Sequence, residues 1–258
     1  MSATPIIDLE GLCVFKAETI LSKITWKVMP GENWVILGAN GAGKSTLLHA
    51  ITAYDSFSGG TIRIDGHTYG EYNWPELRRR IGIVSSELEA RIRPAESALD
   101  VVLGGYFASL GLYDEPTPEL YEKAEDVLTS IGCSYLKNRG WGCLSQGEKR
   151  RVMIGRALMI DPILIILDEP CSGLDPVARE RFLRFLQDLK GPSLVMTTHH
   201  LEDIMPNFTH CLALKGGRVL RAGRLEEVMH EEIISELFDA RLSVTKENDR
   251  YKLNIIKI

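Results

Sequence analysis

The stretch GANGAGKST, residues 38 to 46, decides the fold of this chain. Gly38, Gly43, Lys44 and Ser45 fit the pattern G-x-x-x-x-G-K-[ST], between the apolar runs WVIL and LLHAI. Glycines let such a loop point its backbone N–H groups at phosphate oxygens, and the helix that follows directs its positive end at the same anion. The stretch therefore predicts a phosphate-binding loop. The alternative is a glycine-rich turn that only links a strand to a helix.

A second stretch, ILIILDEP at 163–170, is an apolar run that ends in two carboxylates. A buried strand does not keep free charges in its interior, but its C-terminal end opens onto the crevice where ligands bind. Asp168 suits a magnesium site, and Glu169 suits polarising an attacking water. Lys44 is expected to reach the β- and γ-phosphates of a nucleotide, and Ser45 to bind Mg²⁺. The alternative is an acidic pair that faces solvent at the end of a strand.

A third turn, LSQGE at 144–148, places Ser145 and Gly147 at the start of a predicted helix. The N–H groups of that helix start are again suited to an anion. The alternative is a plain helix cap, because Ser145 and Glu148 form the S-x-x-E pattern of a capping box. Both interpretations can hold together, since capping fixes the amides that would bind phosphate.

The order of the predicted elements indicates an α/β protein. From Ile163 onward, strands predicted at 163–167 and 193–198 alternate with helices predicted at 176–190 and 201–205, which favours a parallel sheet with right-handed crossovers. Short β-rich runs precede the phosphate loop, and residues 87–139 are predicted to be mainly helical, as an insertion into the core. The run at 210–223 is predicted to be a hairpin with Gly216 and Gly217 as its turn, and the last stretch, 241–258, a β hairpin after a helix.

Composition excludes several classes of protein. The 258 residues are 45% hydrophobic and 25% charged with a net charge of −5, so nucleic acid is not an expected partner. The five cysteines are odd in number and lack C-x-x-C spacing, which argues against a disulfide framework or a zinc site and favours a reducing cytosolic compartment. We expect no signal peptide and no spanning helix, because the apolar runs fall far short of about 18 residues.

Taken in order, these motifs resemble those of the ATP-binding cassette (ABC) ATPase family over nearly the whole chain. The loop at 38–46 resembles Walker A, and ILIILDEP resembles Walker B. LSQGE resembles the LSGGQ signature, with Gln146 for the first Gly and Glu148 for the final Gln. SGLD at 172–175 resembles the D-loop, and His199 and Phe15 fall at the switch histidine and at the aromatic residue that stacks on adenine.

The resemblance implies a fold and an assembly. The fold is a P-loop NTPase core with a mostly parallel sheet, an N-terminal antiparallel β subdomain and an inserted helical subdomain. Residues 1–258 then form one ABC-type ATPase domain, with the helical subdomain at about 87–160 and a C-terminal β hairpin at about 240–258. Two protomers, expected to be a homodimer, bind two ATP molecules head to tail, each between one Walker A loop and the partner's signature turn.

The resemblance also implies roles for particular residues. Glu169 and His199 are the catalytic candidates, Asp175 crosses the dimer, and Ser145, Gln146, Gly147 and Glu148 face the partner's ATP. Simpler roles remain open: Asp175 as an N-cap before Pro176, His199 as a structural histidine and Phe15 as core. The implied nucleotide-binding residues are Phe15, Gly38, Asn40, Gly41, Ala42, Gly43, Lys44, Ser45 and Thr46.

One position departs from the family pattern. The family usually has a glutamine that touches Mg²⁺ at the end of the strand matching IGIVSS, where this chain has Ser86 followed by Glu87. Ser86 joins Ser45 and Asp168 as a candidate metal ligand; the alternative is that it only caps the next segment. This SS version and the tail are similar to cytosolic ABC ATPases grouped with molybdate uptake.

The function implied by the resemblance is Mg·ATP hydrolysis that powers transport through separate membrane-spanning subunits. We therefore expect ATP and Mg²⁺ as cofactors. We also expect a cytoplasmic location, peripheral at the inner face of the cell membrane through a partner. The alternative is a soluble ABC ATPase with a cytosolic assembly role, such as iron–sulfur cluster assembly.

Overall fold

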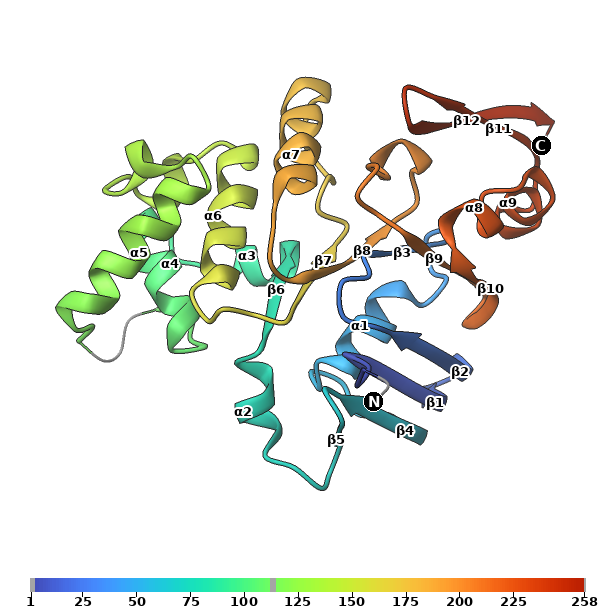
Figure 1. The fold of residues 1–258 in the computed structure, drawn as a ribbon, viewed down its shortest axis with the longest axis horizontal. Helices are drawn as coiled ribbons and strands as arrows, with labels where there is room; N and C mark the ends of the chain where they lie inside the picture. The colour runs from blue at the N-terminus through green and yellow to red at the C-terminus, as the bar shows by residue number, and fades with distance from the viewer. Residues whose placement is uncertain (1–2, 112–114, 258) are drawn as a thin grey trace. The chain divides into compact units, whose positions relative to one another are not determined.

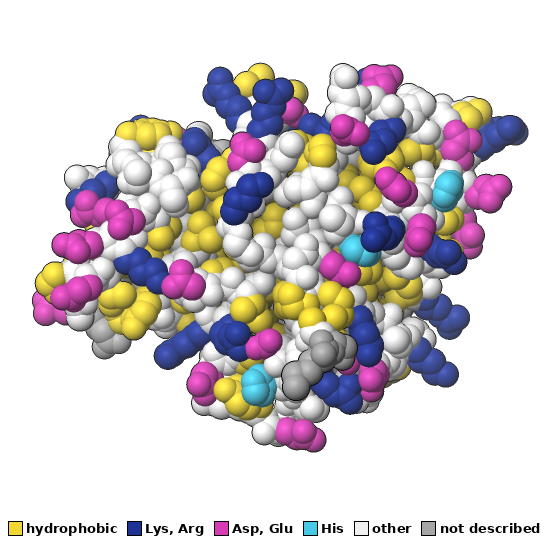
Figure 2. All heavy atoms as spheres, in the orientation of Figure 1, with side chains coloured by type: hydrophobic (Ala, Val, Ile, Leu, Met, Phe, Trp, Pro, Cys, Tyr) yellow, Lys and Arg dark blue, Asp and Glu magenta, His cyan; other side chains and the backbone are white. Residues whose placement is uncertain are grey.

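The computed structural model of the chain describes residues 3–111 and 115–257, which divide into two compact units (Figure 1). Unit 1 takes the described residues of Met1–Leu77 and Ser193–Ile258, and unit 2 takes those of Arg78–Pro192. Residues 112–114 of the predicted helical stretch, and the last residue of the predicted hairpin, lie outside the described residues. On the face that Figure 2 draws, basic and acidic side chains are interspersed over both units.

The N-terminal part of unit 1 is an antiparallel sheet with strand order β2-β1-β4-β5. Ile7 of β1 lies between Val28 of β2 and Ile64 of β4, and all three side chains are fully buried. The expected N-terminal antiparallel β subdomain is therefore observed. Its strands are β1 (Ile7–Phe15), β2 (Thr19–Val28), β4 (Gly59–Ile64) and β5 (His67–Thr68).

A second sheet in unit 1 positions the phosphate loop. The four residues of β3 are buried, and β3 pairs in parallel with β8 on one side and β9 on the other. A strand buried in this way is apolar throughout, as WVIL is. Strand β10 pairs antiparallel with β9. The elements are β3 (Trp34–Leu37), α1 (Lys44–Ile51), β8 (Ser193–Thr198), β9 (His210–Lys215) and β10 (Arg218–Arg224).

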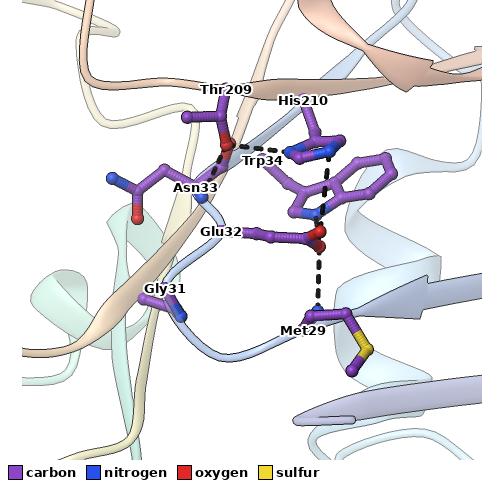
Figure 3. A network of polar contacts seen from close by, with 8 residues as sticks. Met29, Gly31, Glu32, Asn33, Trp34, Thr209 and His210 are labelled. Carbon is purple, nitrogen blue, oxygen red and sulfur yellow. Dashed lines mark hydrogen bonds and ion pairs between the residues drawn. The ribbon is translucent and has the colours of Figure 1, made fainter. Parts of the chain in front are cut away.

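A polar network holds the start of β3 beside the start of β9 (Figure 3). The Glu32 carboxylate accepts hydrogen bonds from the Met29 N–H and from Trp34 Nε1, both at 2.9 Å. The His210 ring stacks on Trp34 with centroids 4.8 Å apart, and His210 Nε2 lies 3.5 Å from the same carboxylate. Thr209 Oγ1 lies 2.8 Å from His210 Nδ1. The network fixes one end of β3, and the phosphate loop leaves the other end.

The C-terminal part of unit 1 ends in the predicted hairpin. Strands β11 and β12 pair antiparallel after helix α9. The helix predicted at 201–205 is wrong, because the chain forms only the 3-10 turn η3 (Leu201–Asp203) there. Pro206 follows directly, and a residue before proline is disfavoured in the α region. The remaining elements are α8 (Leu225–Val228), α9 (Glu231–Phe238), β11 (Arg241–Glu247) and β12 (Arg250–Lys257).

Unit 2 contains two parallel strands and a group of helices. Strand β6 (Ile81–Ser85) pairs with β7 (Leu164–Asp168) and places Ser85 opposite Asp168. The 13-residue helix α6 packs on β6 and on α4. Contact is close: a Cβ at Gly105 of α4 would lie 2.0 Å from the carbonyl oxygen of Arg156 in α6, so only glycine fits.

The stretch predicted to be mainly helical forms a series of short helices. The 3-10 turn η1 (Ser134–Leu136) lies within this stretch, η2 (Trp141–Cys143) follows it, and α2 (Trp74–Arg78) precedes β6. None of the described helices is both long and apolar enough to cross a membrane. The helices of unit 2 are α3 (Ser86–Ala90), α4 (Ala98–Tyr106), α5 (Pro118–Ser130), α6 (Gln146–Leu158) and α7 (Pro176–Asp188).

Candidate functional site

The loop between β3 and α1 requires its glycines. Gly41 and Gly43 have φ of +79° and +99°, in the left-handed region that favours glycine. A Cβ on Gly38 would lie 2.3 Å from the carbonyl oxygen of Leu214. A plain strand–helix link does not demand three such positions. The sequence motif therefore corresponds to a loop that is tightly packed on its strand side.

The loop ends in a helix N-terminus that its own side chains leave uncapped. Gly43 is the N-cap of α1, and within the described chain α1 has neither a side-chain cap nor an acidic residue in its first turn. Lys44 is buried, and its Nζ donates to the carbonyl oxygens of Gly38 at 2.8 Å and Ala39 at 3.2 Å. Ser45, next along, is exposed. This end of α1 combines the positive end of a helix with a lysine, which suits an anion.

The hairpin turn between β9 and β10 contacts the phosphate loop. The Gly217 N–H donates to the Ala42 carbonyl at 3.1 Å, and the Gly217 carbonyl accepts from the Ser22 N–H at 2.8 Å. A Cβ on Gly217 would lie 2.0 Å from the Ile20 carbonyl oxygen. The sequence marked Gly216 and Gly217 as a hairpin turn, and its contact with the phosphate loop was missed. Nothing local in the sequence signals a contact between residues this far apart.

Two further candidates lie in unit 1. Phe15, at the end of β1, is 61% exposed, so it is not part of the core. Its N–H donates to Ser58 Oγ at 2.9 Å, which ties the strand end to the segment before β4. An exposed aromatic ring with a fixed backbone can stack on a planar group.

His199 follows β8 on a turn that buried polar residues hold. Thr198 Oγ1 donates to Asp203 Oδ2 at 2.6 Å and accepts from the His200 N–H at 3.0 Å. Thr198 and Asp203 are buried, and the His199 and His200 rings lie 4.0 Å apart. Sequence reasoning missed Thr198 and Asp203, although a threonine and an aspartate flanking two histidines offer a local signal.

The end of β7 in unit 2 carries the two predicted carboxylates. Asp168 is the last residue of the strand, and Glu169 follows it with φ of +47°. The turn closes when the Ser172 N–H donates to the Glu169 carbonyl at 3.0 Å. A non-glycine residue in the left-handed region is uncommon and is found where surrounding structure holds it.

The capping hypothesis for Ser86 is wrong, because its neighbour takes that role. Ser85 ends β6, and its Oγ accepts from the Leu88 N–H at 3.2 Å, which makes it the N-cap of α3. Ser86 is the exposed first residue of α3. Two adjacent serines made this one-residue distinction inaccessible from the sequence.

The third turn has the predicted capping box. The Ser145 Oγ accepts from the Glu148 N–H at 3.4 Å, and Glu148 Oε2 accepts from the Ser145 N–H at 2.8 Å. Burial alone raises the pKa of Glu148, but the hydrogen bonds from Ser145 and Tyr135 and the charge of Arg139 outweigh it, so the pKa lies below its ordinary value. Ser145 and Gln146 are exposed, and Gly147 and Glu148 are half-buried.

Asp175 is the N-cap of α7, as predicted. Its Oδ1 accepts from the N–H groups of Val177 at 2.9 Å and Ala178 at 3.0 Å, and Pro176 occupies the first helical position. The side chain is exposed at the end of the SGLD turn. Capping orders this turn, and that does not preclude a contact with another molecule.

The predicted metal ligands are oxygen donors, the kind that magnesium prefers. Within residues 3–111 and 115–257, no three His, Cys, Asp or Glu side chains gather closely enough to hold a metal ion. Mg²⁺ typically takes one or two carboxylates and completes its shell with waters and substrate phosphates. Ser45 in unit 1 and Asp168 in unit 2, a hydroxyl and a carboxylate, are donors of that kind.

Comparison with known proteins yields a consistent set of matches. The family model described as ABC transporter matches residues 21–172. The chain is 43% identical over 251 residues to the ABC transporter ATP-binding protein YlmA of Bacillus subtilis, which covers 95% of each chain.

Solved structures agree with that match. The chain is similar to cbiO1 of Clostridium perfringens, part of the ABC transporter complex cbiONQ, with 29% identity, a TM-score of 0.77 and coverage of 90% of this chain and 94% of that one. It is also similar to the ATP-binding cassette MJ0796, a dimer bound to ADP and Pi, with 26% identity, a TM-score of 0.72 and coverage of 85% and 98%.

Proposed function

Because the chain belongs to the ABC transporter family of ATP-binding proteins, we propose that it supplies the energy of ATP hydrolysis to a transporter whose membrane-spanning subunits are separate chains. As a member of that family it binds ATP and is an ATPase with the fold of the ABC cassettes. The observation that carries the proposal is the loop of Gly38 to Lys44, whose glycines and buried lysine frame an uncapped helix N-terminus.

In this proposal, unit 1 holds the nucleotide. Lys44 contacts the β- and γ-phosphates, and the N–H groups of residues 40–46 surround them, as charge and helix polarity favour. Phe15 stacks on adenine, which its 61% exposure permits. His199, on a turn held by buried polar residues, contacts the γ-phosphate.

Unit 2 supplies the hydrolytic carboxylate in this proposal. Glu169 orients and polarises the attacking water, and the hydrogen bond from the Ser172 N–H to its carbonyl holds its backbone in the turn. Ser45 and Asp168 hold Mg²⁺, and Ser86 contributes a hydroxyl directly or through a water. When bound, Mg²⁺ neutralises charge on the phosphates. We propose that residues 1–258 act as one ATPase domain, with the helical subdomain and the C-terminal hairpin as its parts.

Two protomers form the working unit in this proposal. Ser145, Gln146, Gly147 and Glu148 face the ATP held by the partner, and Asp175 reaches across the dimer. The capping box supports this, because it fixes the N–H groups of α6 in one direction at an exposed turn. The dimeric form of the similar cassette MJ0796 supports it as well.

The transport role is tested by purification from native membranes. We expect the tagged chain to be recovered in mild detergent with a multi-spanning membrane protein, as a peripheral subunit at the cytoplasmic face. ATPase activity of the recovered complex should disappear in Lys44→Ala. An ATPase-active chain that is recovered only from the cytosol, without any membrane protein, would contradict transport and favour a cytosolic assembly role.

A further inference from the structure

A buried guanidinium in unit 2 contacts two of the segments that carry predicted motifs. Arg150 lies on α6, five residues after the cap Ser145, and is 3% exposed. Its Nη1 donates to Glu89 Oε1 in α3, and Glu89 is itself buried. Its Nη2 donates to the Ser172 carbonyl at 3.4 Å, in the turn after β7. A buried charge is tolerated only where such partners surround it.

The contact with the Ser172 carbonyl connects Arg150 to the turn that carries Glu169, the predicted catalytic carboxylate. The Ser172 N–H donates to the Glu169 carbonyl at 3.0 Å, while its own carbonyl accepts from Arg150. Glu169 has φ of +47°, a conformation that persists only where the surroundings hold it in place. The side chain of Arg150 is therefore part of what holds the Glu169 turn.

The contact with Glu89 connects Arg150 to α3, the helix that follows the end of β6. Glu89 belongs to α3, which begins at Ser86 directly after β6. The register of β6 and β7 places Ser85, the cap of α3, opposite Asp168. The two branches of the guanidinium thus reach the segments that follow two neighbouring strands, and both segments carry predicted site residues.

We propose that Arg150 is a positioning residue for ATP hydrolysis, which holds the Glu169 turn and α3 in one arrangement relative to the helix that bears the signature turn. The proposal rests on the function proposed above. In this role Arg150 acts through Glu89 and the Ser172 carbonyl. Through these two contacts, the Arg150 side chain links the helix of the signature turn to both segments.

The chemistry of the pair favours positioning over simple stability. Burial raises the pKa of Glu89, and the opposing charge of Arg150 compensates only in part, so this location disfavours a charged group. Apolar side chains can stabilise a buried contact of this kind as well as an ion pair does. A guanidinium, in contrast, has a planar fork that fixes direction as well as distance.

The deciding variant is Arg150→Lys, with Arg151→Lys as its matched control. Lysine keeps a charge for Glu89 but is a point charge that cannot serve both branches as a fork. We expect a folded protein with ATP affinity within about threefold of wild type, because the phosphate loop lies in unit 1, and with kcat at least tenfold lower. Arg151→Lys, which alters a half-buried arginine bonded to Tyr135, should keep wild-type kcat.

A second variant covers the case in which Arg150→Lys does not fold. Glu89→Leu with Arg150→Met removes both charges together and should fold, again with lowered kcat and unchanged affinity for a fluorescent ATP analogue. Wild-type kcat in either folded variant would overturn the proposal. Failure of both to fold, while Arg151→Lys folds, would make Arg150 a purely structural residue and also overturn it.

The same measurements separate this inference from the proposed function. Wild type and Lys44→Ala are measured in parallel. If wild type has no turnover that depends on Lys44, the proposed function fails at the outset. If wild type turns over ATP and the folded Arg150 variants match it, only the positioning role fails.

Discussion

The N-termini of α1 and α6 are both predicted to meet the phosphates of ATP, yet they are built in opposite ways. Helix α1 has Gly43 as its N-cap, has no side-chain cap within the described chain, and has the buried cation Lys44 at its first position. Helix α6 has Ser145 as its N-cap, is closed by a capping box, and has the carboxylate of Glu148 in its first turn. A helix terminus with a cation and unbonded amides attracts an anion by itself. A capped terminus that carries a carboxylate attracts an anion only weakly by itself.

The difference suggests a division of labour between the two termini. Helix α1 would bind ATP in the monomer, and α6 would contribute only once a partner's nucleotide, with its metal and lysine, is already in place. Ser145 and Gln146 are exposed, as expected for a surface that contacts another molecule. Substitutions at one terminus, with the other left as the reference, separate the two roles.

The largest expected effect comes from removing the cation at α1. Lys44→Ala should abolish detectable ATP turnover and lower nucleotide affinity, because the loop loses its charge-assisted contact to the phosphates. Lys149→Ala removes a cation near the start of α6, where Nζ lies 5.4 Å from the Trp141 ring centroid, and should change turnover by less than about threefold. Steady-state phosphate release checks both. Near-normal turnover in Lys44→Ala would refute the phosphate-loop assignment.

The next effect distinguishes the glycines of the two termini. At Gly43, φ is +99° and a Cβ would lie 2.8 Å from Leu21 Cδ2, so Gly43→Ala should cost about 1–3 kcal/mol of stability and impair ATP binding. At Gly147 a Cβ would meet the Ala178 Cβ at an ordinary 3.7 Å. Gly147→Ala should therefore keep or raise stability by up to about 1 kcal/mol, since alanine favours helix.

The function of the Gly147→Ala variant should not follow its stability. We expect normal ATP binding by the monomer, with turnover reduced at least tenfold because a methyl group enters the surface that faces the partner's nucleotide. Denaturant unfolding and a binding titration measure the two quantities separately. Full turnover in a stable Gly147→Ala protein would argue that α6 has only a structural role.

A smaller effect appears in the dependence of stability on pH. The pKa of Glu148 is lowered in the folded chain, so its contribution to stability is fully present above the ordinary glutamate pKa and is lost as pH falls through the lowered value. Glu148→Gln keeps a side-chain acceptor but does not titrate there, so the difference in stability between wild type and variant should narrow on acidification. Unfolding curves at several pH values check this. A difference that does not change with pH would contradict the capping assignment.

The smallest effect separates Ser85, which ends β6, from Ser86, which begins α3. Ser85→Ala should cost about 1 kcal/mol, because Ser85 caps α3. Ser86→Ala should cost little stability and only modestly weaken the Mg²⁺ dependence of ATPase activity, because Ser45 and Asp168 remain as ligands. Thermal unfolding and Mg²⁺ titration compare the pair. A larger stability loss in Ser86→Ala than in Ser85→Ala would reverse their roles.

The sequence allowed prediction of those parts of the site that depend on neighbouring residues. The phosphate loop needs particular residue types at fixed spacing, as do the capping box at Ser145 and the N-cap at Asp175, and each can be recognised within a few positions. The prediction of a helix at 201–205 was wrong because it followed the apolar pattern of these residues and gave too little weight to Pro206, which disfavours helix in the residue before it. The distinction between Ser85 and Ser86 depends on where β6 ends, and strand ends are poorly marked in sequence.

The remaining contacts join residues that are distant in the chain. Gly217 meets Ala42, and Arg150 meets both Glu89 and Ser172, through contacts that only the folded chain creates. Local composition does not reveal such partners, since a buried arginine and a surface arginine on a helix are written identically. The sequence thus predicts which groups would do the chemistry, and the structure was needed to find the contacts that hold their segments.

The central claim is that both helix termini serve ATP within a dimer, and Glu169→Gln tests it most directly. This change should slow hydrolysis by roughly 10²- to 10⁴-fold while leaving ATP binding intact. Size-exclusion chromatography with light scattering should then show a stable dimer in Mg·ATP, with two ATP per dimer, and a monomer without nucleotide. Adding Lys44→Ala to the same chain should return it to a monomer. A Glu169→Gln protein that binds ATP and stays monomeric would contradict the account.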